Sequence, residues 1–268
     1  MNVALRKAGE TMNRKEDYIA VFDSGVGGIS VLRHLVALMP GERFLYYGDS
    51  ANAPYGTRST EQVRQLTLAA AAKLVTEYPL KALVVACNTA TAAAISDLRQ
   101  AYPELIIIGI EPALKLAWDH FPGGNIGVMA TEVTLREEKF DSLLHRFGHS
   151  DRVVKISAPG LVEQVEAGQC DTPQTEALLR SILEPWRGKL DVLVLGCTHY
   201  PFAAGAIRRI LGDGTELVDG GEGTARETRR RLEQMDLLSR RETGSVEFTG
   251  SKWDGSVRML AQRLLEQK

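Results

Sequence analysis

Residues 192–201 read Val192-Leu193-Val194-Leu195-Gly196-Cys197-Thr198-His199-Tyr200-Pro201. The aliphatic run at the start is typical of a strand that is buried on both faces. A helix-like segment, 202–211, follows it. In an open α/β sheet, ligands bind just beyond the carboxyl ends of the strands. We therefore expect a thiol, a hydroxyl and an imidazole, from Cys197, Thr198 and His199, to lie together at that edge.

A second segment repeats this pattern. Leu83-Val84-Val85-Ala86-Cys87-Asn88-Thr89-Ala90 is again a buried strand, a cysteine and two polar residues, and an Ala-rich helix, 91–99, follows. A single cysteine after an apolar run is most often a small buried hydrophobe. Two cysteines in matching contexts, nearly half a chain length apart, instead favour two similar halves that each deliver one thiol.

Composition excludes several classes of protein. A chain of 268 residues can form one large domain or two modest ones. Its net charge of −2 offers no basic field for nucleic acid or an anionic membrane. No apolar run approaches the ~20 residues of a membrane span. Residues 1–16 are polar and lack the apolar core of a signal peptide, so we expect a poorly ordered extension of a cytoplasmic protein.

Three cysteines are too few for a disulfide framework, and their spacing excludes Cys-x-x-Cys zinc patterns. Cys170 lies in a polar run away from any predicted strand end, and we treat it as incidental. His145 and His149 have the i, i+4 spacing of a metal pair, but a zinc site needs at least three protein ligands. We therefore expect no metal. The basic run 229–231 is interpreted as a solvated helix face.

Strands and helices alternate along the chain, which predicts parallel, doubly wound sheets. The predicted strands are 18–22, 44–49, 83–86, 105–110, 125–130, 153–157, 192–195, 216–219 and 246–249. The predicted helices are 29–39, 60–77, 91–99, 135–147, 159–168, 202–211, 224–235 and 255–267.

The first strand is followed by the glycine-rich turn Asp23-Ser24-Gly25-Val26-Gly27-Gly28. Such a turn ahead of a helix favours an anion, yet it does not match G-x-G-x-x-G or a P-loop, and Asp23 would repel a phosphate. A small ligand that carries both a carboxylate and an ammonium fits better. The alternative is that Asp23 simply caps the helix. After the second strand, the loop 50–58 is too elaborate for a connector, so we expect binding groups there.

Taken together, four blocks resemble the glutamate racemases, cofactor-independent enzymes that supply D-glutamate for bacterial peptidoglycan. The segments 159–168 and 217–220 add weaker support. The four blocks are Phe22-Asp23-Ser24-Gly25-Val26-Gly27-Gly28, Tyr47-Gly48-Asp49-Ser50-Ala51-Asn52-Ala53-Pro54-Tyr55-Gly56, Ala86-Cys87-Asn88-Thr89-Ala90 and Gly196-Cys197-Thr198-His199-Tyr200-Pro201.

The resemblance implies an α/β fold of two similar doubly wound lobes with central, mainly parallel sheets and an active site in the cleft between them. One lobe would comprise residues 17–112 and 220–268, and the other residues 113–219. It also implies that glutamate is the small-molecule partner, that no cofactor is used, and that the protein is a monomer or homodimer.

Racemisation removes the Cα proton on one face and returns a proton on the other, which suits one thiolate and one protonated thiol. The resemblance assigns abstraction from D-glutamate to Cys87 and from L-glutamate to Cys197. Asp23 would assist Cys87, and His199 with Glu166 would assist Cys197. Because each cysteine precedes a helix, we expect the helix N-terminus to lower its pKa.

Hydroxyls and backbone amides are expected to hold the substrate carboxylates, and Asp23 the ammonium. The substrate contacts that the resemblance implies are Asp23, Ser24, Pro54, Tyr55, Gly56, Asn88, Thr89, Thr131, Thr198 and His199. Two other functions stay open. An aspartate racemase or a related decarboxylase would share the fold, and a non-catalytic amino-acid-binding protein would have no need of two matched cysteines.

Overall fold

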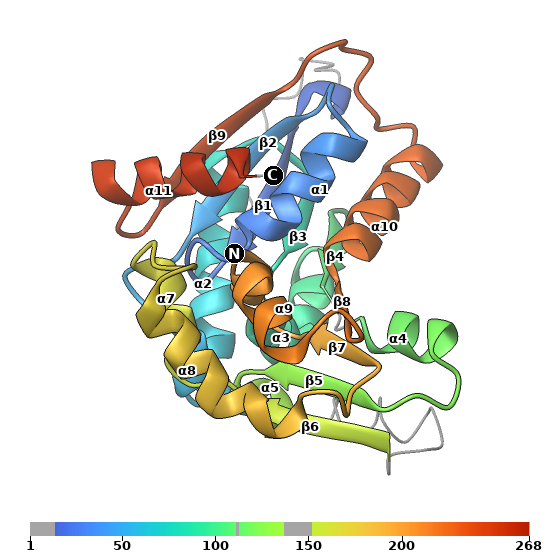
Figure 1. The fold of residues 1–268 in the computed structure, drawn as a ribbon. Helices are drawn as coiled ribbons and strands as arrows, with labels where there is room; N and C mark the ends of the chain where they lie inside the picture. Colours follow the sequence, from blue (N-terminus) through green and yellow to red (C-terminus); the bar gives the residue numbers. More distant parts are fainter. Residues whose placement is uncertain (1–13, 111–112, 137–151, 268) are drawn as a thin grey trace, which may run out of the picture.

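The computed structural model describes residues 14–110, 113–136 and 152–267. Their strands form two sheets in which all paired neighbours are parallel (Figure 1). The first sheet has the order β4-β3-β1-β2-β9 and the second β6-β5-β7-β8. The strands are β1 (Tyr18–Asp23), β2 (Arg43–Gly48), β3 (Leu80–Val85), β4 (Ile106–Gly109), β5 (Ile126–Ala130), β6 (Val153–Ser157), β7 (Val192–Leu195), β8 (Glu216–Asp219) and β9 (Ser245–Gly250).

Helices cover both faces of each sheet. On the first sheet, α1 (Ile29–Leu38), α10 (Gly221–Gln234) and α11 (Gly255–Glu266) share one hydrophobic core, and α2 (Thr60–Glu77) and α3 (Asn88–Ala101) share the other. On the second sheet, α4 (Leu114–His120) and α5 (Glu132–Arg136) pack on one face. The opposite face carries α7 (Leu161–Glu166), α8 (Pro173–Leu183) and α9 (Ala204–Leu211). We call the first sheet with its helices the first lobe, and the other the second lobe.

The two sheets have the same topology. Read from β2, the first runs β2-β1-β3-β4, and the second runs β6-β5-β7-β8. Among the described strands, only β9, at the edge beside β2, has no counterpart. The prediction of two similar doubly wound lobes is therefore confirmed. Every residue of β1, β3 and β7 is buried, which explains why their sequences are continuous apolar runs rather than alternating ones.

This topology places both cysteines at equivalent points. The strand order reverses direction between β1 and β3 in one sheet and between β5 and β7 in the other. A reversal of this kind opens a crevice at the carboxyl ends of the strands, where ligands bind. Cys87 follows β3 and Cys197 follows β7. Each lobe thus places one cysteine at the crevice formed by the carboxyl ends of its own strands.

Several predicted elements differ in extent. The predicted helix 202–211 is a 3-10 turn, η5 (Tyr200–Ala203), that leads into α9, with Pro201 in its first turn. Of the predicted helix 135–147, only the end of α5 is described, and His145 and His149 lie outside the described residues. Most of the predicted N-terminal extension also lies outside them, whereas Arg14–Glu16 form a short 3-10 helix, η1. Two further 3-10 turns are η2 (Tyr55–Thr57) and η4 (Glu184–Trp186).

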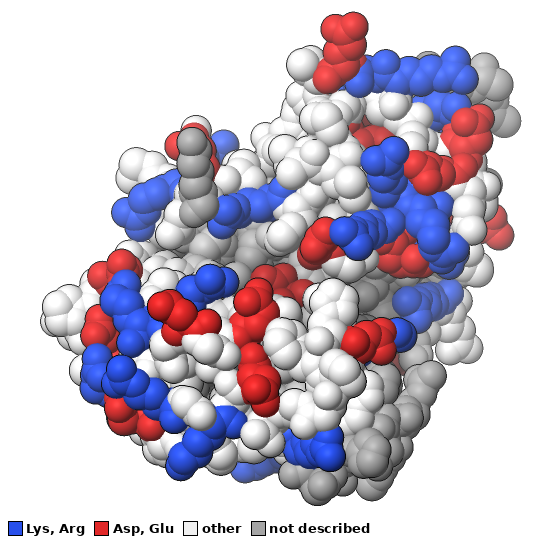
Figure 2. All heavy atoms as spheres, turned by 45° about the vertical axis from the view of Figure 1, so that its right-hand side comes forward, with Lys and Arg blue, Asp and Glu red and all other residues white. Residues whose placement is uncertain are grey.

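The chain crosses between the lobes twice, from β4 to α4 and from β8 to α10. We propose that the lobe boundaries fall at 112/113 and 219/220, close to these crossings. On the face shown in Figure 2, acidic and basic side chains are interspersed. The basic run 229–231 is exposed on α10, as expected, and Arg229 and Arg230 form ion pairs with neighbouring glutamates. Within the described ranges, no helix is long and apolar enough to cross a membrane.

Candidate active site

A small cavity lies between the lobes and is lined by both. Its volume is about 20 Å³, which is room for about one water molecule, so the lobes are closed on each other. All of the predicted substrate contacts except Asp23 line it, and Val162 of α7 is an addition. The lining residues are Ser24, Pro54, Tyr55, Gly56, Cys87, Asn88, Thr89, Thr131, Val162, Cys197, Thr198 and His199.

Cys87 lies at the N-cap of α3. Its Sγ accepts a hydrogen bond from the Ala90 N–H at 3.5 Å, and its thiol donates to Ser24 Oγ at 3.7 Å. Burial and the nearby Asp23 carboxylate raise the pKa of Cys87 to about 12 and outweigh both of these contacts. The N–H of Ala90 at the helix N-terminus does act to lower this pKa, as predicted, but the net shift is upward, because a single N–H does not replace the water that the thiolate would lose.

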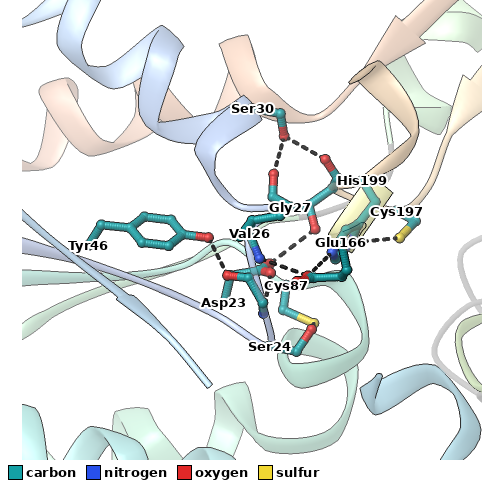
Figure 3. A network of polar contacts seen from close by, with 12 residues as sticks. Asp23, Ser24, Val26, Gly27, Ser30, Tyr46, Cys87, Glu166, Cys197 and His199 are labelled. Carbon is teal, nitrogen blue, oxygen red and sulfur yellow. Dashed lines mark hydrogen bonds and ion pairs between the residues drawn. The ribbon is translucent and has the colours of Figure 1, made fainter. Parts of the chain in front are cut away.

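Cys197 has different neighbours. Its Sγ lies 3.7 Å from His199 Nδ1, and His199 Nε2 lies 2.6 Å from Glu166 Oε1 (Figure 3). Burial lowers the pKa of His199, but its bonds with Cys197 and Glu166 outweigh burial and raise it well above its usual range. Burial likewise raises the pKa of Glu166, and its bonds with His199 and Val26 more than offset this. An imidazolium beside a thiol favours the thiolate.

Asp23 is fully buried and does not line the cavity. Its Oδ1 accepts from the Gly25 N–H at 3.0 Å, and its Oδ2 accepts from Thr198 Oγ1 at 3.0 Å. The side chain does not cap α1, whose N-cap is Gly28 without a side-chain bond. Burial raises the pKa of Asp23. In this closed state, Asp23 holds Thr198 of the other lobe against the first lobe.

Three threonine hydroxyls meet beside the cavity, and two of them, those of Thr89 and Thr131, belong to residues that line it. Thr89 Oγ1 lies 3.2 Å from that of Thr131 and 3.3 Å from that of Thr134, and the last two are 3.1 Å apart. Thr134 was missed in the sequence, although its position three residues after Thr131 at the start of a helix is a usable signal. The buried Oδ1 of Asn88 has no hydrogen-bond partner in the structure, so it is an acceptor available to a ligand.

The described part of the chain contains no group of three or more His, Cys, Asp or Glu side chains that could hold a metal ion. Cys170 is buried in the hydrophobic core that also contains α1 and α11, and it does not line the cavity. The chemistry that the cavity offers is thus that of two thiols from opposite lobes, one beside an imidazole and one beside a hydroxyl.

Known proteins resemble this chain in sequence and in fold. The family model for Asp/Glu/hydantoin racemases matches residues 20–228. A glutamate racemase of Clostridium perfringens is 42% identical over 252 residues, which cover 93% of this chain and 96% of that protein. The crystal structure of a glutamate racemase isoform from Bacillus anthracis aligns with a TM-score of 0.84 at 32% identity, over 95% of this chain and 96% of that one.

A second solved relative is the Escherichia coli glutamate racemase, in complex with L-glutamate and the activator UDP-MurNAc-ala. It aligns with a TM-score of 0.82 at 30% identity, over 93% of this chain and 95% of that one. This chain thus matches known glutamate racemases in both sequence and fold over more than nine-tenths of its length. The protein belongs to the Asp/Glu/hydantoin racemase family, among the glutamate racemases.

Proposed function

We propose that this protein interconverts L- and D-glutamate by transferring protons at Cα between two cysteines, without a cofactor. The observation that carries the proposal is that Cys87 and Cys197 line one cavity from opposite lobes. We further propose that it acts in the cytoplasm as a monomer or homodimer and supplies D-glutamate for peptidoglycan synthesis. The similarity to glutamate racemases over more than nine-tenths of the chain supports the choice of substrate.

With L-glutamate, the thiolate of Cys197 takes the Cα proton, and the electron pair of that bond stays on the substrate. The thiol of Cys87 then gives its proton to the opposite face of Cα. D-glutamate leaves, and the enzyme is left with a Cys197 thiol and a Cys87 thiolate. The reverse reaction starts from that form. His199 stabilises the Cys197 thiolate, and Glu166 acts through His199 as a positioning residue.

The Cα–H of an amino acid is a far weaker acid than a thiol, so the site must also stabilise the charge that develops. Donors for the substrate carboxylates are available in the hydroxyls of Thr89 and Thr131, both of which line the cavity. The unpartnered Oδ1 of Asn88 suits the ammonium group. An ammonium close to Cys87 would also favour its thiolate, which its surroundings disfavour in the empty site.

Polarimetry tests the substrate directly. We expect the optical rotation of L-glutamate to fall to zero with the purified protein, without added pyridoxal phosphate, and that of L-aspartate to persist. Loss of rotation with L-aspartate alone would point to an aspartate racemase. Persistence of both rotations under conditions in which glutamate binds would point to a binding protein. Strict dependence on pyridoxal phosphate would contradict the two-thiol mechanism.

The roles of the two thiols are tested by Cys87→Ser and Cys197→Ser. Racemisation should fall by at least ~10²-fold in each variant, because each loses one positioned acid or base. Elimination from a 3-chloroglutamate needs only one base, because the electron pair of the broken C–H bond forms the Cα–Cβ double bond while chloride leaves with the electrons of the C–Cl bond. Cys87→Ser should therefore still act on the L enantiomer and Cys197→Ser on the D enantiomer. The same enantiomer preference in both variants would show that one cysteine is structural.

A further inference from the structure

The glycine-rich turn of the first lobe packs directly against Glu166 and His199 of the second lobe. A Cβ atom built at Gly25 would lie 1.8 Å from Glu166 Oε1, and one at Gly27 would lie 2.4 Å from His199 Nδ1. Neither glycine has a positive φ, so an alanine backbone is permitted at both positions. These glycines are therefore required for space rather than for backbone conformation.

The same turn supplies a hydrogen bond. The N–H of Val26 donates to Glu166 Oε1 at 2.8 Å, and that oxygen also lies 2.6 Å from His199 Nε2 (Figure 3). The anion that this turn binds in the closed structure is thus a carboxylate from the other lobe. Because the bond runs between the lobes, it exists only when they are closed.

We propose that the glycine turn, at residues 25–27, is a positioning element for the Cys197 base: on closure it fixes Glu166, and through it His199, against Cys197. The inference rests on the proposed function and names a part of its machinery in the opposite lobe. The bond from Val26 contributes to the lowered pKa of Glu166, in keeping with this role. Opening the lobes would remove that bond and loosen the imidazole beside Cys197.

The consequence is specific to one face of the substrate. The sulfur of Cys87 contacts Ser24 and the Ala90 N–H, and neither contact involves Glu166 or His199. A change that displaces Glu166 should therefore impair proton abstraction from L-glutamate more than abstraction from D-glutamate. A general loss of folding or closure would impair both.

The test uses Gly25→Ala and Gly27→Ala, each assayed by elimination from the two enantiomers of 3-chloroglutamate. We expect a loss of about 10²-fold with the L enantiomer, the cost of a misplaced catalytic group, and a change within a few-fold with the D enantiomer. The alkaline limb of the L-side pH profile should move to lower pH, because His199 loses part of the contact that raises its pKa. Gly205→Ala, where an added Cβ meets nothing closer than 3.7 Å, is the control.

A double-mutant cycle isolates the contact with Glu166. Glu166→Ala removes the atoms that the Gly25→Ala methyl would strike, so adding Gly25→Ala to it should cost nothing further in either L-side elimination or thermal stability. Equal losses with both enantiomers in Gly25→Ala and Gly27→Ala, or a full additional loss in the double variant, would overturn the inference. If Gly25→Ala alone does not fold, two other measurements still decide the inference. One is the stability of the double variant compared with that of Glu166→Ala. The other is the ratio of the elimination rates of Gly27→Ala with the L and D enantiomers.

A failure of the proposed function looks different. In that case the unmodified protein would not racemise glutamate at all, and the L/D comparison between variants would have no starting activity. Racemisation by the unmodified protein with an unchanged L/D ratio in both glycine variants would leave the function standing and remove only the role of the turn.

Discussion

Two cysteines that follow equivalent strands have unlike electrostatic surroundings. Cys87 faces a serine hydroxyl and the charge of Asp23, and its pKa rises to about 12. Cys197 faces His199, whose contact with Glu166 favours an imidazolium. In the free, closed enzyme we therefore expect Cys87 to carry its proton. Under the proposed mechanism, this form acts on L-glutamate, and the form with a Cys87 thiolate is reached when D-glutamate is released.

Alkylation should reveal this difference. With iodoacetamide at pH 8, we expect Cys197 to react before Cys87 and Cys170, because only a thiolate is nucleophilic and burial raises the pKa of the last two thiols. Peptide mass spectrometry measures the order, and bound glutamate should slow the reaction at Cys197. The urea-unfolded protein, in which all three thiols are equally exposed, is the control. Earlier labelling of Cys87 would contradict the assignment of charge.

At the scale of elements, a buried ion pair joins segments that are distant in the sequence. Lys81 at the start of β3 forms an ion pair with Glu42, which precedes β2, and both side chains are almost fully buried. Lys81 also donates to the carbonyls of Lys15 at 2.6 Å and Leu237 at 3.0 Å, and Glu42 accepts from the Ser239 N–H at 2.8 Å. The pair therefore attaches η1 and the α10–β9 connection to the sheet.

Glu42→Gln should destabilise the protein by about 3–5 kcal/mol, because it removes the carboxylate that bonds directly to the buried Lys81 ammonium. The free energy of unfolding in urea measures this. Glu233→Gln on α10 is the matched control: its partner Arg229 is exposed, and such a pair is worth only about 0.3–0.5 kcal/mol. A similar small loss in both variants would mean that Lys81 reaches water or another acceptor. Activity per folded molecule should not change, because neither residue lines the cavity.

At the scale of the whole molecule, the closed cavity is far smaller than glutamate, so substrate entry requires the lobes to separate. Hydrogen bonds between the lobes oppose this separation. The hydroxyl of Thr198 donates to the Asp23 carboxylate, and the backbone carbonyl of Thr198 accepts from Ser30 Oγ at 2.9 Å. Val26 bonds to Glu166. Under the proposed mechanism, closure of the lobes therefore also assembles the acid–base groups.

Ser30→Ala should shift the molecule toward the open form. A net loss of about 1 kcal/mol, typical of one hydrogen bond, corresponds to about a five-fold larger open population. Alkylation of Cys197 should become faster by that factor, and saturating glutamate should restore protection. Ser181→Ala is the control, since the exposed hydroxyl of Ser181 donates to the Leu178 carbonyl within the same helix, α8. An unchanged alkylation rate in Ser30→Ala would show that closure does not limit access to the thiol.

The local sequence pattern was sufficient to predict most of the fold and the position of the two thiols. Runs such as those of β3 and β7 are buried on both faces, which a short window of sequence reveals. Helix α2 was predicted with both ends correct, and Ser59 and Gln62 form a capping box at its start. The alternation of these elements implied parallel strands, and parallel strands bring the residues after them to one edge. Cys87 and Cys197 could therefore be assigned to that edge from the sequence.

The roles of Asp23, the glycine turn and Thr134 depended on atoms far away in the chain. Asp23 bonds to Thr198 across 175 residues, and Val26 bonds to Glu166 across 140 residues. Nothing in the turn itself reveals that its glycines make room for another lobe. The sequence by itself determined which groups reach the two crevices, because that follows from strand burial and chain order. Only the tertiary structure determined how those groups are charged and paired, because desolvation and hydrogen bonding depend on what the opposite lobe places beside them.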